Sequence, residues 1–201
     1  ERTPYILFDR NFSQAPAHFV GSDDVQVGEI ATEHLIDLGR TRIAHIGGKN
    51  TSPSVGRLNG YKKALASHRL PVRAEAIVAR DRVEETGDLQ GFQAMQELLA
   101  LKARPDAVFC YNDLTAVGAM EATLKAGLRI PEDIAFIGCG NFRYADYLRV
   151  PLSSIDHGTA ELGRIAGEFA LDLSANPGQP VRSILTQSRL VVRESSVRAS
   201  G

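Results

Sequence analysis

The stretch "PDAVFCYNDLTAVGAM", residues 105–120, contains the two patterns that determine the fold class. An uninterrupted apolar run over 107–111 stops at Asn112 and Asp113, and an alanine-rich segment with helical spacing follows. Apolar runs without alternation are typical of strands that are covered on both faces, as in a parallel sheet. Asp113 is expected to cap the helix that follows, which leaves Asn112 for another role.

The same order of strand and helix repeats along the chain. Apolar runs rich in β-formers lie at 5–9, 42–47, 76–79, 107–111 and 134–138, and helical patterns lie near 25–38, 54–68, 88–101 and 114–126. This alternation predicts an α/β fold of parallel sheets with helices on both faces. Beyond it, a further helix is predicted over 160–173, and strands over 183–186 and 189–192 are expected to pair as antiparallel neighbours.

Composition excludes several classes of protein. The 201 residues carry a net charge of -1, and the pI of about 6.6 is too low for a domain that holds nucleic acid by itself. No apolar run is long enough to cross a membrane. Cys110 and Cys139 lie in or next to apolar runs, so we expect buried thiols in a reducing compartment, with a disulfide as the alternative. The spacing of cysteines and histidines predicts no metal site.

Polar or glycine-rich residues follow four predicted strands, at 9–10, 47–50, 112–113 and 138–141. The carboxyl ends of parallel strands share one edge, where open sheets bind their ligands. Turn chemistry explains any one of these sequences alone, but four together predict a small-molecule cleft. The chain shows no nucleophile elbow or acid–base pair, and its histidines are scattered at positions 18, 34, 45, 68 and 157. We therefore expect no enzyme and no cofactor.

Six segments, in order, resemble the effector-binding core of the lac repressor (LacI/GalR) family of transcription regulators. They are "PYILFDR" (4–10), "VGSDDVQVGEIATEHLIDLGRTRIAHIGG" (20–48), "SPSVGRLNGYKKAL" (52–65), "PDAVFCYNDLTAVGAMEATLKAGLRIPEDIAFIG" (105–138), "VPLSSI" (150–155) and "VVRESS" (191–196). The resemblance implies a periplasmic-binding-protein-like fold, in which two α/β subdomains are hinged by three chain crossings.

The resemblance also divides the chain. Residues 1–24 would end the N-terminal subdomain, 25–156 would form most of the C-terminal effector-binding subdomain, 157–180 would hold a return helix of the N-terminal subdomain, and 181–201 the final strands of the C-terminal one. The family's helix-turn-helix headpiece and the first part of its N-terminal subdomain have no counterpart here. The helix at 160–173 would then expose its apolar face, which favours a segment of a longer chain.

The family pattern implies roles for individual residues. Arg57 matches an arginine that reaches ligand oxygens, Asn112 a residue that bonds ligand hydroxyls, and Asp9 a further ligand-facing acid. A guanidinium offers five N–H donors in a rigid fork, which suits a carboxylate or vicinal hydroxyls. Asn141 and Phe142 are expected to line the same end of the cleft. The structural alternatives are a surface salt bridge for Arg57 and a turn-closing role for Asn112.

Gly140 departs from the family pattern. Members commonly carry "GYD" or "GFD" where this chain has "GCGN" at 138–141. Without that carboxylate, the site loses an acceptor for sugar hydroxyls and also a repulsion against anions. This favours a sugar acid or a phosphorylated sugar held by Arg57. The alternative is that Asn141 takes over the missing role, or that a neutral sugar does not need it.

The resemblance implies the ligand-sensing and dimerising core of a bacterial transcription regulator, expected to be a cytoplasmic repressor. It would act on operator DNA through a headpiece absent from this chain. A homodimer surface is expected on the helix at 114–126 and the segment 144–150, with Val117, Tyr144, Tyr147 and Leu148. The alternative is a periplasmic sugar-binding protein of a transporter, which an upstream signal peptide would distinguish from a regulator.

Overall fold

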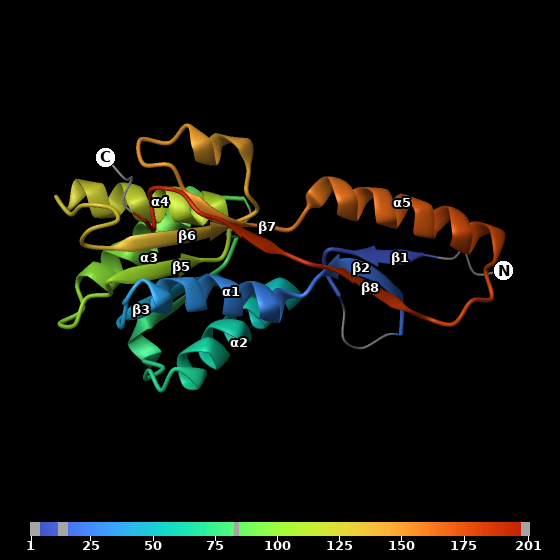
Figure 1. Cartoon of the computed structure of the whole chain (residues 1–201), viewed down its shortest axis with the longest axis horizontal. Coiled ribbons are helices and arrows are strands. Elements are labelled where there is room, and N and C mark those ends of the chain that lie inside the picture. Colours follow the sequence, from blue (N-terminus) through green and yellow to red (C-terminus); the bar gives the residue numbers. More distant parts are fainter. Residues whose placement is uncertain (1–4, 12–15, 83–84, 198–201) are drawn as a thin grey trace.

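The chain folds into two α/β units of unequal size (Figure 1). The computed structural model describes residues 5–11, 16–82 and 85–197. A sheet with the strand order β4-β3-β5-β6-β7-β9 forms the centre of the larger unit, and one with the order β1-β2-β8 forms that of the smaller unit. Every strand pair is parallel except β7 with β9. The predicted α/β fold with parallel sheets is therefore confirmed.

Helices cover both faces of the larger sheet. Its strands are β3 (Ile43–Gly48), β4 (Ile77–Arg80), β5 (Ala107–Cys110), β6 (Ala135–Cys139), β7 (Ser153–Asp156) and β9 (Arg189–Val191). On one face lie α1 (Asp24–Asp37) and α2 (Ser52–Ser67), on the other α3 (Gly87–Leu99) and α4 (Asp113–Lys125), with short 3-10 helices η1 (Ala74–Ala76) and η2 (Arg143–Asp146) in the connections. Within the described residues, no helix combines the length and apolar character that crossing a bilayer requires.

Strand β5 shows why the apolar runs do not alternate. Its side chains Ala107 and Phe109 join the core under α1 and α2, whereas Val108 and Cys110 join the core under α3 and α4. All four are fully buried, so both faces of the strand require apolar residues. Cys110 and Cys139 are free and buried, which confirms the predicted buried thiols.

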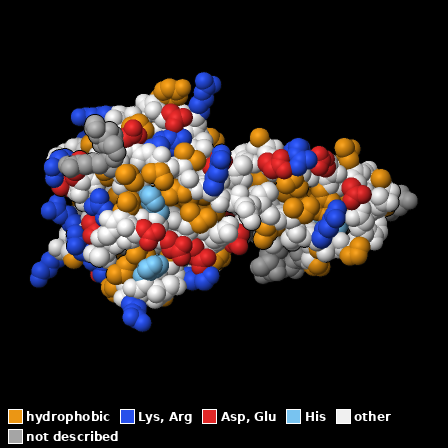
Figure 2. All heavy atoms as spheres, in the orientation of Figure 1, with side chains coloured by type: hydrophobic (Ala, Val, Ile, Leu, Met, Phe, Trp, Pro, Cys, Tyr) orange, Lys and Arg blue, Asp and Glu red, His pale blue; other side chains and the backbone are white. Residues whose placement is uncertain are grey.

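In the smaller unit, a sheet covers the helix that was expected to expose its apolar face. This unit contains β1 (Ile6–Phe8), β2 (His18–Ser22), β8 (Ser183–Thr186) and α5 (Thr159–Ala175). Leu162 and Phe169 of α5 are 3% exposed and pack with Val20 of β2. The expectation that this helix exposes its apolar face is therefore wrong, because strands from both ends of the chain assemble a sheet beneath it. Figure 2 shows hydrophobic side chains gathered on the surface of this unit.

The predicted pairing of the last two strands is also wrong. β8 pairs in parallel with β2, whereas β9 pairs antiparallel with β7 in the other sheet. Between them, Gln187 and Ser188 carry the chain onward from one sheet to the other instead of turning it back (Figure 1). Residues 181–201, predicted to belong to one subdomain, thus contribute strands to both sheets, and the other subdomain boundaries remain predictions.

Three short segments connect the two units. They join β2 to α1 at Ser22–Asp23, β7 to α5 at His157–Gly158, and β8 to β9 at Gln187–Ser188. These are the three chain crossings that the family resemblance implies. The carboxyl ends of β3, β5 and β6 therefore face the smaller unit across the crossings.

His45 is a buried histidine in the core of the larger unit. Its ring stacks between Tyr61 and Phe109, with centroid distances of 5.5 and 4.9 Å. Nδ1 donates to the carbonyl oxygen of Phe109 at 3.0 Å. Burial lowers the pKa of His45 to about 4, from an ordinary value of 6.5. The folded protein therefore holds this imidazole neutral at pH values where the unfolded chain protonates it.

We expect the protein to lose stability as the pH falls from 7 to 4. In this interval the unfolded chain binds a proton at His45 that the folded state does not bind, so the free energy of unfolding falls by about 3 kcal/mol from this residue. Urea denaturation at several pH values should show a shallower pH dependence for H45F than for the wild type. The exposed His68 gives the matched control, H68Q. An unchanged slope in H45F would contradict the assignment.

Candidate functional site

Arg57 of α2 is buried at the edge of the larger sheet, beside the crossings. It is 6% exposed, which rules out the alternative of a surface salt bridge. Nε donates to Oδ1 of Asp24 at 3.0 Å, and Nη1 donates to the carbonyl oxygen of Tyr111 at 2.6 Å. Nη2 lies 3.3 Å from Nε2 of His157. The guanidinium carbon also stands 4.8 Å from the centroid of the Tyr111 ring. These contacts fix the guanidinium where strand ends from the larger sheet meet the smaller unit.

Glycines at the crossing of α1 and α2 make this placement possible. A Cβ at Gly28 would lie 2.1 Å from the carbonyl oxygen of Arg57, and one at Gly60 would lie 2.0 Å from that of Val25. Only glycine allows the two helix backbones to approach so closely. The close approach brings Arg57 within hydrogen-bonding distance of Asp24, the first residue of α1.

His157 was not predicted as a site residue, yet it meets Arg57. Its Nε2 also lies 3.0 Å from Sγ of Cys139, and its Nδ1 lies 3.3 Å from the hydroxyl oxygens of Ser22 and Ser188. Burial and the neighbouring Arg57 lower the pKa of His157 to about 4. The sequence signal that could have singled it out is its position directly after β7, a strand that ends at this edge.

Cys139 does not have the properties of a nucleophile. It is 1% exposed, and burial raises the pKa of its thiol to about 12. The thiol is therefore protonated at neutral pH, despite the nearby guanidinium. Among the described residues, no group of three or more metal-ligating side chains comes together. The contacts that the structure gives around Arg57 and His157 are hydrogen bonds and one ion pair.

The N-cap role predicted for Asp113 belongs to Asn112 in the structure. Asn112 is the N-cap of α4, and its Oδ1 accepts a hydrogen bond from the amide of Thr115 at 2.8 Å. Asp113 is fully buried, and its carboxylate accepts from the hydroxyl of Ser154 at 2.5 Å and from the amide of Phe142 at 2.8 Å. The cap prediction for Asp113 is wrong, because its carboxylate ties the neighbouring loop instead. Whether Asn112 also bonds a ligand remains a prediction.

The loop after β6 carries two further predicted site residues. Asn141 accepts a hydrogen bond at Oδ1 from Nη2 of Arg193 at 2.8 Å, whereas Phe142 is 58% exposed at the surface. Gly140, between them and the strand, has φ +128°, and a Cβ there would lie 2.9 Å from the Phe142 ring. The glycine that replaces the family's aspartate thus has a conformational reason as well as the electrostatic one.

Asp9 approaches the same place from the smaller unit. It follows β1 with φ +63°, and its amide donates to the carbonyl oxygen of Val20 at 2.9 Å. Burial raises the pKa of Asp24, and the negative charge of Asp9 adds to this effect while Arg57 opposes it. Asp9 is thus close enough to the edge of the larger unit to influence a carboxylate there. Its ligand-binding role remains a prediction.

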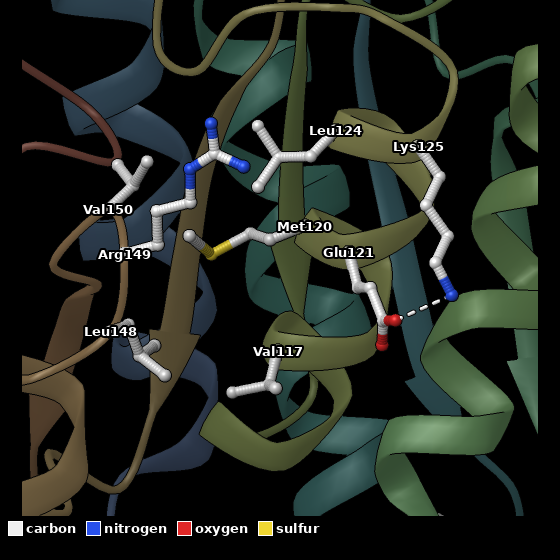
Figure 3. Close-up of a pocket in the computed structure, with 8 residues that line it drawn as sticks. All are labelled: Val117, Met120, Glu121, Leu124, Lys125, Leu148, Arg149 and Val150. Atoms are coloured by element: carbon white, nitrogen blue, oxygen red, sulfur yellow. Dashed lines mark ion pairs between the residues drawn. The ribbon is translucent and has the colours of Figure 1, made fainter.

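A second feature is a groove of about 430 Å³ on the outer face of α4 (Figure 3). Val117 and Leu148, two of the residues predicted for a dimer surface, point into it from opposite sides. Glu121 and Lys125 form an ion pair of 2.7 Å on one wall. The other predicted residues lie outside the groove, since Tyr144 stacks on Phe142 at 5.8 Å and Tyr147 is 74% exposed. The lining is completed by Met120, Leu124, Arg149 and Val150.

Arg193 holds together the segment 141–152, which runs from the loop after β6 to this groove. Its Nη2 bonds Asn141, its Nε donates to Oδ1 of Asp146 at 2.5 Å, and its Nη1 donates to the carbonyl oxygen of Leu152 at 2.8 Å. This arginine belongs to the segment "VVRESS" and was not predicted as a site residue. The structure shows that it ties the start, the middle and the end of the segment 141–152 together.

Comparison with known proteins agrees with this fold. Residues 32–196 match the model of the periplasmic binding protein-like domain family. The chain belongs to this family. It is 36% identical over 193 residues to the ribose operon repressor of Haemophilus influenzae, an alignment that covers 96% of this chain and 57% of that repressor. The chain thus spans little more than half the length of that relative.

Two solved structures are similar to this family member. A complex of the transcriptional regulator CelR with cellobiose matches with a TM-score of 0.89 and 30% identity, covering 96% of this chain and 58% of that one. A LacI family regulator from Enterococcus faecium with bound ribose matches with a TM-score of 0.84 and 28% identity, covering 98% and 71%. The predicted resemblance to regulators of the LacI family is therefore confirmed.

We expect N112A to destabilise the protein by about 1 kcal/mol, the usual cost of removing an N-cap side chain. N112S keeps an oxygen that accepts from the amide of Thr115, and it should therefore retain most of the stability. Urea denaturation of the two variants measures the difference. Equal stability of N112A and the wild type would show that the contact between Asn112 and Thr115 does not stabilise α4.

Proposed function

We propose that this chain is the effector-binding and dimerising core of a transcription repressor that senses a small sugar between its two units. The observation that carries the proposal is the buried guanidinium of Arg57, placed with His157 and Asp24 at the crossings. Three acceptors surround a group with five N–H donors, so donors remain for ligand hydroxyls. The relative named above is a repressor of a ribose operon, and similar structures hold cellobiose and ribose. This also disfavours the periplasmic transport alternative.

A ligand in this place would bridge the two units. Asp9 would accept hydroxyl hydrogens from the smaller unit, while Arg57 and Asn112 would bind from the larger one. A ligand that binds one arrangement of the units more tightly shifts the population toward it. In a cytoplasmic regulator this shift would alter the spacing of two DNA-binding headpieces on a two-fold operator. The chain spans 57% of the length of its repressor relative. The DNA-binding headpieces are therefore part of what we propose and not of the structure described.

The charge around Arg57 favours a neutral sugar over the acidic effector considered from the sequence. Asp24 already balances the guanidinium at 3.0 Å, and Asp9 brings a further negative charge close to them. An anionic ligand would need an excess of positive charge, which this arrangement does not provide. Vicinal hydroxyls, by contrast, can accept from Arg57 and donate to Asp9 in one ligand.

We expect a neutral sugar such as D-ribose or cellobiose to stabilise the chain in a thermal-shift assay. At about 100 times the dissociation constant, a specific ligand adds about 2.7 kcal/mol to the free energy of unfolding. D9N should weaken binding about tenfold or more, because it removes a charged acceptor of a ligand hydroxyl. D81N, an exposed acid on the larger unit, is the control. Stabilisation by D-galacturonate or ribose 5-phosphate alone would overturn the neutral-sugar proposal.

We further propose that the groove on α4 is the dimer surface. Val117 and Leu148 give it an apolar floor, and a charge placed there would be buried without a partner. V117D and L148D should therefore raise the dimer dissociation constant at least a hundredfold in sedimentation equilibrium. L171D carries the same change at a side chain that is 75% exposed on α5, and it should leave the dimer intact. A dimer that tolerates both groove variants would contradict the assignment.

A further inference from the structure

One side chain touches every connection between the two units. His157 lies on the second crossing, and its Nδ1 is 3.3 Å from the hydroxyl of Ser22 on the first and 3.3 Å from that of Ser188 on the third. The three side chains belong to residues that are only 6 to 8% exposed. Three segments that are distant in sequence therefore meet at a single buried imidazole.

The contacts on the other side of the ring determine its tautomer. Nη2 of Arg57 can only donate, so Nε2 of His157 accepts, and the ring proton is on Nδ1. Sγ of Cys139 lies 3.0 Å from the same Nε2, so with this tautomer its thiol is placed as a second donor to that nitrogen. Nδ1–H then donates toward the hydroxyl oxygens of Ser22 and Ser188. A second ring proton would set a positive charge against Arg57, so this arrangement requires neutral histidine.

We propose that His157 is a positioning residue that couples the engagement of Arg57 with a ligand to the relative placement of the two units. The inference rests on the proposed ligand-binding role of Arg57. Nε2 of the ring accepts a hydrogen bond from the guanidinium of Arg57. Nδ1–H donates toward Ser22 and Ser188, which lie on the other two crossings. A ligand oxygen that draws Nη2 away from Nε2 releases the imidazole, and reorientation of the ring changes the bonds that hold the crossings together.

Two substitutions separate this role from simple packing. In H157Q, the side-chain oxygen accepts from Arg57 while the amide nitrogen donates to the serine hydroxyls, so both sets of contacts are retained. In H157F, a ring of similar size fills the space but bonds neither side. A residue that only fills volume would be replaced better by phenylalanine, whereas the proposed coupling is rescued by glutamine.

The first experiment is hydrogen–deuterium exchange of the 201-residue chain without ligand. We expect H157F to speed exchange at least tenfold in peptides covering 20–24, 156–159 and 186–190, with β5 unchanged, and H157Q to behave like the wild type. The double variant S22A/S188A, which leaves the histidine in place, should loosen the same three segments. Exchange altered only at 156–159 in H157F, or crossings unaffected in S22A/S188A, would overturn the proposal.

The second experiment repeats the exchange measurement with D-ribose as the probe. We expect the sugar to change exchange at all three crossings in the wild type and in H157Q. In H157F at saturating D-ribose, we expect the change in exchange to persist at 55–59, around Arg57, and to disappear at 20–24 and 186–190. A sugar-induced change that persists at all three crossings in H157F, or that is lost at 55–59 as well, would overturn the positioning role. If neither D-ribose nor cellobiose binds the wild type, the effector proposal fails. The experiment without ligand still decides whether His157 holds the crossings together.

Discussion

A buried guanidinium is the constraint on which the rest of this structure depends. An arginine removed from water needs acceptors for its donors and a counter-charge close by. Asp24 supplies the charge, and the carbonyl of Tyr111 and the imidazole of His157 supply further acceptors. These partners come from the start of α1, the end of β5 and the crossing after β7. The site is therefore assembled only when the sheet order is complete.

The contacts at the crossings differ in kind from those inside each unit. The cores are close-packed apolar clusters, which resist gradual deformation. Where the units meet, Ser22, His157 and Ser188 are joined by directional hydrogen bonds instead. Hydroxyl and imidazole groups can exchange such bonds for equivalent ones with a ligand. A hinge built in this way would let two rigid bodies move without disturbing the core of either.

The loop after β6 and the groove on α4 are parts of one connected structure. Asp113, in the first turn of α4, accepts a hydrogen bond from the amide of Phe142 in that loop. Arg193 binds Asn141 at the start of the same segment and Asp146 further along it. The helix that lines the groove and the loop after β6 are therefore fixed to each other. This gives the candidate site a short structural route to the proposed dimer surface.

The sequence by itself determined most of the alternation of strands and helices, the edge of the sheet where the candidate site lies, and the family, although no predicted strand covers β2. These features follow from local patterns, because an apolar run of a given length and period fits only a few kinds of buried strand or helix. It also placed Arg57 at the site, through the family resemblance. Which strands pair, and which side chains bond one another, was decided by the tertiary structure alone. Four features depend on residues that are distant in sequence or that compete for one partner. They are the pairing of β8 with β2, the cover over α5, the choice of Asn112 rather than Asp113 as the N-cap of α4, and the contacts of His157. Local patterns do not encode such choices, since strand pairing and side-chain hydrogen bonds are settled by which groups the folded chain brings within reach.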